Sequence, residues 1–404
     1  MSNKSFIALS PCLVHATIGT TVFLGKPVDT SFSMKFKATV RDAKTLAAVA
    51  STLKGFSKKV TLKLHPTRLR LISCPSTAAA ASHSCQVWSS CHTAAMLVDA
   101  RIESKSHDGS IYCDLPDVTP LIHALRSCER AAGGATLKLT KVGPRPVLSL
   151  SMQHAGMGHD IMHDVPVRVL AEAEVASLIV APALERVLVQ VTLPHLTDVA
   201  AFVDRVRQVG GADTLTFAVR VGTVARRKAV HELALVIHRR LARLGLLPVG
   251  SPLHFPSSSS SAVAAAGGGG ESASLLSLSA DGMTLSLSMG YHDVDASVTI
   301  QGVSDETAAP QGEEDLAEDD AAWLDLGRAE EAPYRLDAVR LAENRVPTSV
   351  SVAVDVKKIV RFLSVKDVTP IKVVAHVVAD RALVLSAHAV GDTNLVFFIP
   401  ATIS

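Results

Sequence analysis

The sequence predicts an α+β fold of two similar domains, each an antiparallel sheet with two helices on one face. Two observations predict it. The order strand, helix, strand, turn, strand recurs four times, and strands with alternating apolar and polar residues outnumber the helices. Halves rich in strands with few helices are typical of the α+β class. Four units in series therefore indicate two domains of two units each.

The first unit occupies residues 34–73. An alternating strand leads to Asp42, which is a good N-cap for the helix that follows, and two further strands are joined by a turn at His65-Pro66-Thr67. The second unit, residues 110–152, repeats this order. Pro120 lies in the first turn of its helix, where the missing N–H costs nothing.

The third unit starts at RVLVQVTL and continues into the helix PHLTDVAAFVDRVRQVGG, but its last strand is delayed until after residue 274. The fourth unit is the clearest. It has the strand TSVSVAV, a helix capped by Asp355 and a closing strand NLVFFIP.

These units give a domain plan. Residues 34–153 are expected to form the first domain, 154–168 an extended connector rich in Gly, His and Asp, and 169–404 the second domain. Three segments interrupt the plan: an N-terminal extension at 1–33, an insertion at 222–273 with a basic helix and a Ser/Ala/Gly linker, and an insertion at 304–347 with an acidic loop.

The net charge of +2 conceals an uneven distribution. Residues 313–331 hold nine acidic residues and one Arg, so the other 385 residues carry 39 basic and 29 acidic side chains. A basic body is compatible with nucleic-acid binding. No stretch approaches the roughly 20 uninterrupted apolar residues that a membrane span needs, so no membrane is expected as a partner.

Basic residues recur on the helix faces that point away from the sheets. A single exposed Lys or Arg is normally just solvated, but recurrence on equivalent helices indicates a positive surface that would hold phosphates without reading bases. The third helix contributes least, since Asp204 sits beside its basic residue. The candidates are Lys44, Lys54, Lys58, His123, Arg126, Arg130, Arg205, Lys357 and Arg361.

Two clusters raise the alternative of a metalloenzyme: Cys74, His83, Cys85, Cys91 and His92 in one, and His154, His159, His163, Asp160 and Asp164 in the other. Their spacings match no standard zinc pattern, so a surface loop and a solvated linker are the favoured interpretations. Trp88 is likewise assigned to a loop. We expect no catalytic residues, no metal and no cofactor.

The basic segment 225–243 leaves several interpretations open. It could grip DNA, act as a nuclear-import signal or bind a partner, while the favoured interpretation is a helix that packs its apolar side on the body. Pairing with the acidic run 313–331 is a further alternative. Trp323, flanked by acidic residues, could be a docking motif or could pack on the body.

Three segments resemble a known family: MKFKATVRDAKTLAAVASTLKGFSKKVTLKLHPTRLRLISC, HDIMHDVPVRVL, and VDVKKIVRFL with the terminal FFIPATIS. Together they are similar to the Hus subunits of the checkpoint sliding clamp, the nine-one-one complex, which is related to PCNA. The resemblance runs from Met34 to the C-terminus apart from the two insertions.

This resemblance implies the DNA sliding-clamp fold, with helices on the inner, channel face, and places the nine basic candidates in that channel. It implies a heterotrimer with two other clamp-fold subunits, loaded by an ATP-dependent clamp loader around double-stranded DNA in the nucleus. The ring would be a platform for checkpoint kinase activators and repair enzymes, and the chain would perform no chemistry. The last strand of each domain is expected to be a docking edge. The alternative is a general scaffold or adaptor that does not encircle DNA.

Overall fold

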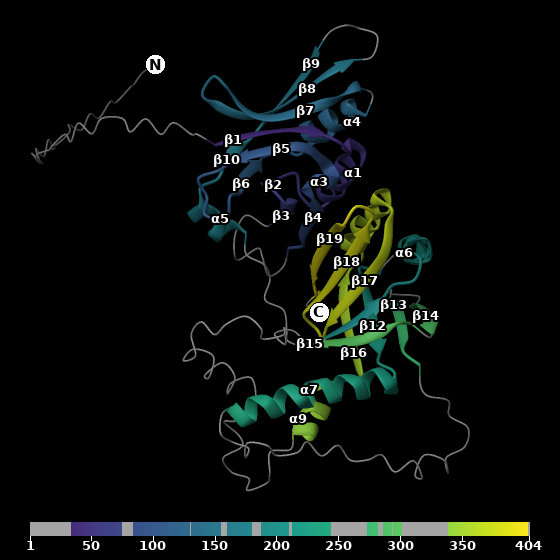
Figure 1. The fold of residues 1–404 in the computed structure, drawn as a ribbon. Coiled ribbons are helices and arrows are strands. Elements are labelled where there is room, and N and C mark those ends of the chain that lie inside the picture. Colours follow the sequence, from purple (N-terminus) through teal and green to yellow (C-terminus); the bar gives the residue numbers. More distant parts are fainter. Residues whose placement is uncertain are drawn as a thin grey trace, which may run out of the picture. The chain divides into compact units, whose positions relative to one another are not determined.

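The computed structural model describes most of the chain from Met34 onward: residues 34–74, 84–129, 131–154, 160–179, 187–209, 212–243, 273–281, 286–292, 294–300 and 338–402. Met34–Ser404 form one compact unit. Figure 1 shows the fold of this unit.

The described residues of the first half form nine strands and three helices. They are β1 (Lys35–Val40), α1 (Ala43–Lys54), β2 (Val60–Leu64), β3 (Arg68–Ser73), β4 (Gln86–His92), α3 (Thr93–Met96), β5 (Leu97–Glu103), β6 (Ile111–Leu115), α4 (Thr119–Cys128), β7 (Ala131–Val142), β8 (Arg145–His154) and β9 (Asp160–Pro166). The predicted strand–helix–strand–strand order is confirmed for β1 to β3 and for β6 to β8. Asp42 caps α1 as predicted, since its carboxylate accepts a hydrogen bond from the Thr45 N–H at 2.9 Å.

The second half repeats the plan with additions. It comprises β10 (Arg168–Val169), α5 (Glu172–Leu178), β11 (Val187–Thr192), α6 (Leu196–Val209), β12 (Thr214–Arg220), α7 (Thr223–Arg243), β13 (Leu275–Asp281), β14 (Ser286–His292), β15 (Ala296–Ile300), α9 (Ala338–Arg345), β16 (Ser349–Asp355), α10 (Val356–Phe362), the 3-10 helix η2 (Leu363–Val368), β17 (Pro370–Val378), β18 (Ala382–Ala389) and β19 (Thr393–Pro400).

The strands form three antiparallel sheets. Five strands pair in the order β5-β1-β7-β8-β9, four in the order β14-β13-β12-β16, and ten in the order β10-β6-β2-β3-β4-β19-β18-β17-β11-β15. The ten-stranded sheet crosses from one half to the other where β4 pairs with β19, with Val87 opposite Phe397. The two halves therefore share one continuous sheet.

The core lies where the alternating strands turn their apolar side toward the helices. In β12 the residues Leu215, Phe217 and Val219 are all buried, and in β19 Leu395, Phe397 and Ile399 are buried in the same alternation. Each fully buried Leu or Phe contributes about 1.5–3 kcal/mol through removal of its apolar surface from water. This burial fixes which face of every helix remains exposed.

One expectation was wrong: residues 86–92 are not a surface loop. They form β4, which contains Trp88 and buries Cys91 completely. The reason lies in Ser89, whose buried hydroxyl exchanges hydrogen bonds of 3.0 Å with the backbone of Leu71 on β3. A Ser whose hydroxyl is fully hydrogen-bonded can occupy a core position, and a hydrophobicity pattern does not identify such a position.

The connector predicted at 154–168 also differs from the structure. Asp160–Pro166 form β9, which pairs with β8 from Val147↔Pro166 to Gln153↔Asp160. The last strand predicted for the third unit, after residue 274, is two paired strands in the structure, β13 and β14. In both cases a strand pairs with the strand directly before it in the chain. The chain therefore reverses direction where the prediction had it run on in one direction.

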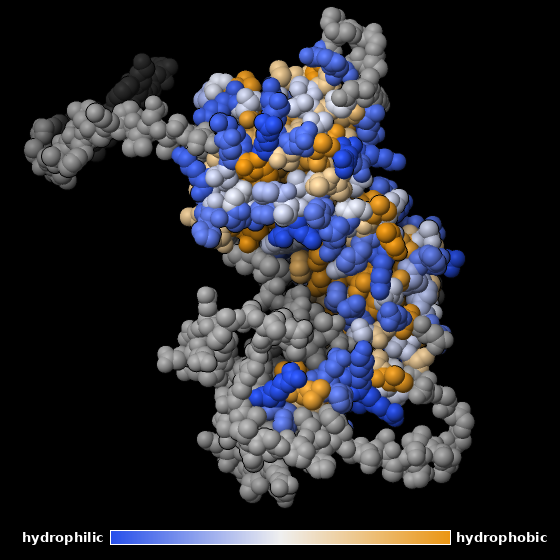
Figure 2. Space-filling view, viewed as in Figure 1, coloured by the Kyte–Doolittle hydropathy of each residue, from blue (hydrophilic) through white to orange (hydrophobic). Residues whose placement is uncertain are grey.

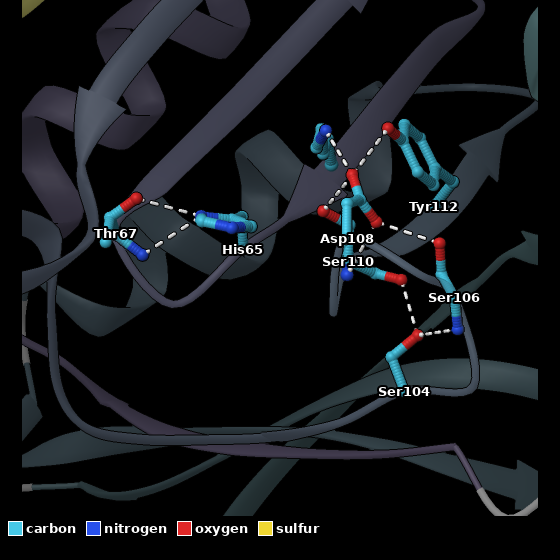
Figure 3. A network of polar contacts seen from close by, with 8 residues as sticks. His65, Thr67, Ser104, Ser106, Asp108, Ser110 and Tyr112 are labelled. Carbon is cyan, nitrogen blue, oxygen red and sulfur yellow. Dashed lines mark hydrogen bonds and ion pairs between the residues drawn. The ribbon is translucent and has the colours of Figure 1, made fainter.

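A polar network closes the loop between β5 and β6 (Figure 3). The Asp108 carboxylate accepts hydrogen bonds from Lys63 Nζ at 2.8 Å, from the Ser106 hydroxyl at 2.8 Å and from the backbone and hydroxyl of Ser110 at 3.0 and 2.8 Å. Lys63 Nζ also lies 4.9 Å from the centroid of the Tyr112 ring. One carboxylate therefore fixes the loop onto β2 and β6.

Candidate nucleic-acid interface

The first helix of the candidate site, α1, presents a basic outer face because its opposite face is apolar. Leu46, Val49 and Leu53 are buried, whereas Lys44 and Lys54 are exposed. This is the division expected when one stripe of an amphipathic helix packs on a sheet. Lys58, which follows the end of α1, is exposed as well.

The outer face of α4 adjoins that of α1. Leu121, Ile122 and Leu125 of α4 are buried, and His123 and Arg126 are exposed. The Arg126 guanidinium donates a hydrogen bond of 3.3 Å to the hydroxyl of Ser51 on α1, and the two helices are in contact. The basic stripes predicted on these two helices thus form one surface.

Lysines in α1 and just after it lower the pKa of an acidic residue at the start of α4. Hydrogen bonds from Thr119 lower the pKa of Asp117 below its usual value, and the positive charges of Lys58 and Lys54 lower it further. These two lysines consequently lie near the N-terminal end of α4, although they do not form an ion pair of 4 Å or less with any residue that the structure describes.

In the second half, α10 repeats the arrangement. The Asp355 carboxylate accepts a hydrogen bond of 2.7 Å from the Lys357 N–H, which confirms the predicted N-cap, and Ile359 and Phe362 are buried. Lys357 and Arg361 are exposed on the opposite side.

The 3-10 helix η2, which directly continues α10, adds exposed Lys366. The sequence reading missed this residue because the predicted helix ended before it. The sequence offered one signal for this residue: a Lys less than two helical turns after the end of the predicted helix. The helix η2 contacts α1, α6 and α10, and Lys366 lies beside the residues that lead into α6, among them His195.

Helix α6, the helix of the third unit, contributes the least positive charge, as predicted. Arg205 is exposed, but Asp204 is its neighbour, and Asp204 forms an ion pair of 3.7 Å with Arg207 in the next turn. This helix adds little net charge to the surface.

Eight of the nine predicted residues are therefore exposed on the outer sides of these helices or directly after α1, whereas Arg130 lies outside the described residues. The contacts run from α4 to α1, from α1 to η2, and from η2 to α10 and α6. Helices α1, α4 and α10 contain six Lys or Arg and no Asp or Glu. Such a surface attracts phosphates through charge alone.

In the cysteine cluster, burial raises the pKa of each thiol that the structure describes. Burial raises the pKa of Cys74 and of Cys91 to about 11, and that of Cys85 to about 12 despite the opposing charges of Lys358 and Arg361. These thiols are neutral at physiological pH, whereas nucleophiles and metal ligands are thiolates. His83 and His159 lie outside the described residues, among which no group of side chains could hold a metal ion.

The sheet edges correct another expectation. The last strand of the second half, β19, is not an edge, because it pairs with β18 on one side and with β4 on the other. In the two smaller sheets, among the strands that the structure describes, β9 and β14 each have one paired neighbour, β8 and β13 respectively. Free strands of this kind can extend a sheet into another chain.

Comparison with known proteins gives one family and one fold. A family model described as Hus1-like protein matches residues 34–247 and 285–403, well over half of the chain, and this match includes α7. PCNA from Thermococcus kodakaraensis superposes with a TM-score of 0.51 at 11% identity, covering 90% of this chain and 99% of that chain. This likeness supports the PCNA-like clamp fold.

A second solved structure, proliferating cellular nuclear antigen from Entamoeba histolytica, superposes with a TM-score of 0.48 at 10% identity, covering 91% of this chain and 99% of that chain. No curated protein matches the sequence. Among the helices that the structure describes, none is long and apolar enough to cross a membrane.

Proposed function

The chain belongs to the Hus1-like protein family, and on this premise we propose that it is a subunit of a heterotrimeric checkpoint clamp that encircles duplex DNA. Membership of this family and the PCNA-like fold together make it a clamp-type subunit. We propose three further properties: the checkpoint role, assembly into a ring and binding to DNA.

The observation that carries the proposal is the positive charge on the outer faces of α1, α4 and α10, which together form the helix layer. Lys44, Lys54, Lys357 and Arg361 are exposed on α1 and α10 and do not form ion pairs with described residues. Side chains that hold no protein partner are free to replace the counterions of a phosphate backbone. No exposed aromatic residue accompanies them in the helix layer as described, so the expected binding is independent of base sequence.

The pairing of β4 with β19 supports ring assembly. In the repeated plan, β9 occupies the place in the first half that β19 occupies in the second, and β14 is the equivalent of β4. Inside the chain this pair joins the two halves. The same pairing between chains, β9 with the strand of a neighbouring clamp-fold subunit that is equivalent to β14, would continue the arrangement around a ring.

On this proposal the chain is a scaffold without catalytic residues, cofactor or metal, and it acts in the nucleus. Its partners are two other clamp-fold subunits, an ATP-dependent clamp loader, double-stranded DNA, checkpoint kinase activators and repair enzymes. Because it binds DNA independently of base sequence, the ring can slide along the duplex. Its other surfaces bind the partner proteins.

Assembly is tested first, by purifying the tagged chain from cells and measuring the native mass and composition of its complex. We expect one copy each of this chain and of two other clamp-fold proteins. A stable complex without any clamp-fold partner would contradict the heterotrimer and favour the general scaffold.

The grip on DNA is tested in the assembled complex with the triple variant Arg126→Glu, Lys357→Glu and Arg361→Glu. We expect the trimer to form normally and its retention on closed circular DNA, after loading, to fall at least tenfold. The matched control reverses the same number of exposed charges outside the helix layer, at Arg101, Lys105 and Arg145. Equal retention of the two variants would refute the channel assignment.

A further inference from the structure

Helix α7 has one face buried and one face that is basic. Its apolar residues pack against β15 and α9: Ala229, Val230, Leu233, Ala234 and Ile237 are all buried. On the other side Arg227, Lys228 and Arg239 are exposed, and they do not form ion pairs with described residues. Figure 2 shows hydrophilic residues along the described part of this helix.

The contact between α7 and α9 is specific. The Arg226 guanidinium donates hydrogen bonds of 3.1 Å to the Glu343 carbonyl and 3.3 Å to the Val346 carbonyl, at the C-terminal end of α9. A cation at the end of a helix satisfies its free carbonyls and complements its dipole. Ala342 and Val346 are buried at the same place, so α9 is held firmly on α7.

The two elements that flank the acidic run in the sequence both contact α7. Residues 301–337 start where β15 ends and finish where α9 begins, and both β15 and α9 contact α7 (Figure 1). The acidic run 313–331 lies within this stretch. A segment tethered beside a surface at both ends meets it at an effective concentration on the order of millimolar.

The charges of the two segments are complementary. The acidic run carries nine Asp or Glu and one Arg, whereas α7 carries six Lys or Arg and one Glu. We propose that the acidic run 313–331 docks in cis on the exposed basic face of α7. Each exposed ion pair alone is weak, but several pairs formed by a tethered segment act together.

The contact makes α7 a shielded basic surface. Other polyanions, such as a nucleic acid, reach Arg227, Lys228 and Arg239 only by displacing the acidic run. The surface is distinct from the helix layer of α1, α4 and α10, so it can be tested without reference to the grip on DNA described above.

Cross-linking tests the contact directly in the full chain. A carbodiimide joins a carboxylate to a Lys amine without adding a spacer, so Lys228 reports on acidic groups that touch α7. We expect Lys228 to be joined to peptides from 313–331 at low salt and the yield to fall sharply in 1 M salt. The control Lys228→Arg keeps the charge but removes the reactive amine.

Mixing chains of natural and heavy nitrogen isotopes separates contact within a chain from contact between chains. Cross-linked peptide pairs of a single isotope support docking in cis. Mixed pairs, or Lys228 joined mainly to other acidic residues, would overturn it. Absence of any cross-link to 313–331 at low salt would overturn it as well.

Binding to a fluorescent duplex oligonucleotide gives an independent measurement. Changing the nine acidic residues to their amides is expected to tighten binding by about tenfold at low salt, because the face of α7 is released. Adding Arg227→Glu, Lys228→Glu and Arg239→Glu should abolish this gain. If the helix-layer changes at Arg126, Lys357 and Arg361 abolish it instead, or if the amide variant binds no tighter, the proposal fails.

Discussion

The rings of Phe56 and Phe397 pack against each other at the junction between the two halves of the chain, with centroids 5.4 Å apart and planes inclined at 49°. Phe397 also meets Phe362 of α10 edge-on, at 5.0 Å and 85°. Both distances are within the range of favourable aromatic pairs. One fully buried ring from β19 thus contacts the segment after α1 and helix α10, which carry basic residues of the candidate interface.

Loss of this ring is expected to be costly. Phe397→Ala should lower the free energy of unfolding by about 3–5 kcal/mol, because it removes buried apolar surface and leaves a cavity at the junction. Urea denaturation measures the change. Val390→Ala is the control, since Val390 is 70% exposed and its loss should matter little. A similar small effect of both changes would show that the junction does not depend on the ring.

The Asp108 network predicts a pH-dependent contribution to stability. Burial alone would raise the pKa of Asp108, but hydrogen bonds from Lys63, Ser106 and Ser110 together lower it well below its usual value. Because the unfolded chain then takes up the proton first, the contribution is present at neutral pH and is lost as the pH falls below about 3.9.

Asp108→Asn should therefore destabilise the protein at pH 7 by about 1 kcal/mol, a modest value because the carboxylate is 41% exposed. The difference from the wild type should shrink steadily below pH 4. Urea denaturation at several pH values measures it. Ser106→Ala should show a smaller loss with the same pH dependence, and a difference that stays constant down to pH 2 would contradict this account.

Local signals made much of the fold predictable. The caps at Asp42 and Asp355 are confirmed because each depends only on a side chain and the backbone two or three residues later. The strand β4 was missed because burial of Ser89 depends on hydrogen bonds to Leu71 on another strand. The partner of β19 was missed for the same kind of reason, since its pairing with β4 joins distant parts of the chain.

The candidate interface was predictable to a similar degree. Helical periodicity identified which side of α1, α4 and α10 is basic, because packing on a sheet fixes the exposed stripe. It could not show that Arg126 donates a hydrogen bond to Ser51 on a neighbouring helix, nor that η2 contacts α1 and α6. Those relations depend on how helices pack against one another, which the periodicity of a single helix does not report.

The buried thiol of Cys91 predicts chemical inertness. Burial raises its pKa to about 11, although the side chain of Thr393 opposes the shift. Because alkylating reagents attack the thiolate, modification of Cys91 at pH 7.5 should be at least 100-fold slower in the native protein than in urea. Mass spectrometry of pulse-alkylated peptides measures the two rates. Rapid native modification would indicate a reactive cysteine and reopen the enzymatic alternative.

The edge strand β9 gives a prediction for assembly. Met162 on this strand is 61% exposed, an unusual degree for a large apolar side chain. If β9 pairs with the strand equivalent to β14 in a neighbouring clamp-fold subunit, Met162 lies at or beside the new strand pair. Met162→Asp would then place a carboxylate at a surface that becomes desolvated on assembly, and burial of an unpaired charge is costly.

We expect Met162→Asp to weaken association with the clamp-fold partners at least tenfold, or by about 1.4 kcal/mol, while the stability of the isolated chain stays unchanged. Native mass measurements over a dilution series determine the affinity. The matched control is Val142→Asp, which changes a side chain of similar exposure, 55%, next to the β7–β8 turn rather than on an edge strand. Because both variants add one charge at an exposed apolar position, only a contact made through β9 separates them, and equal affinities would rule out this edge as the docking strand.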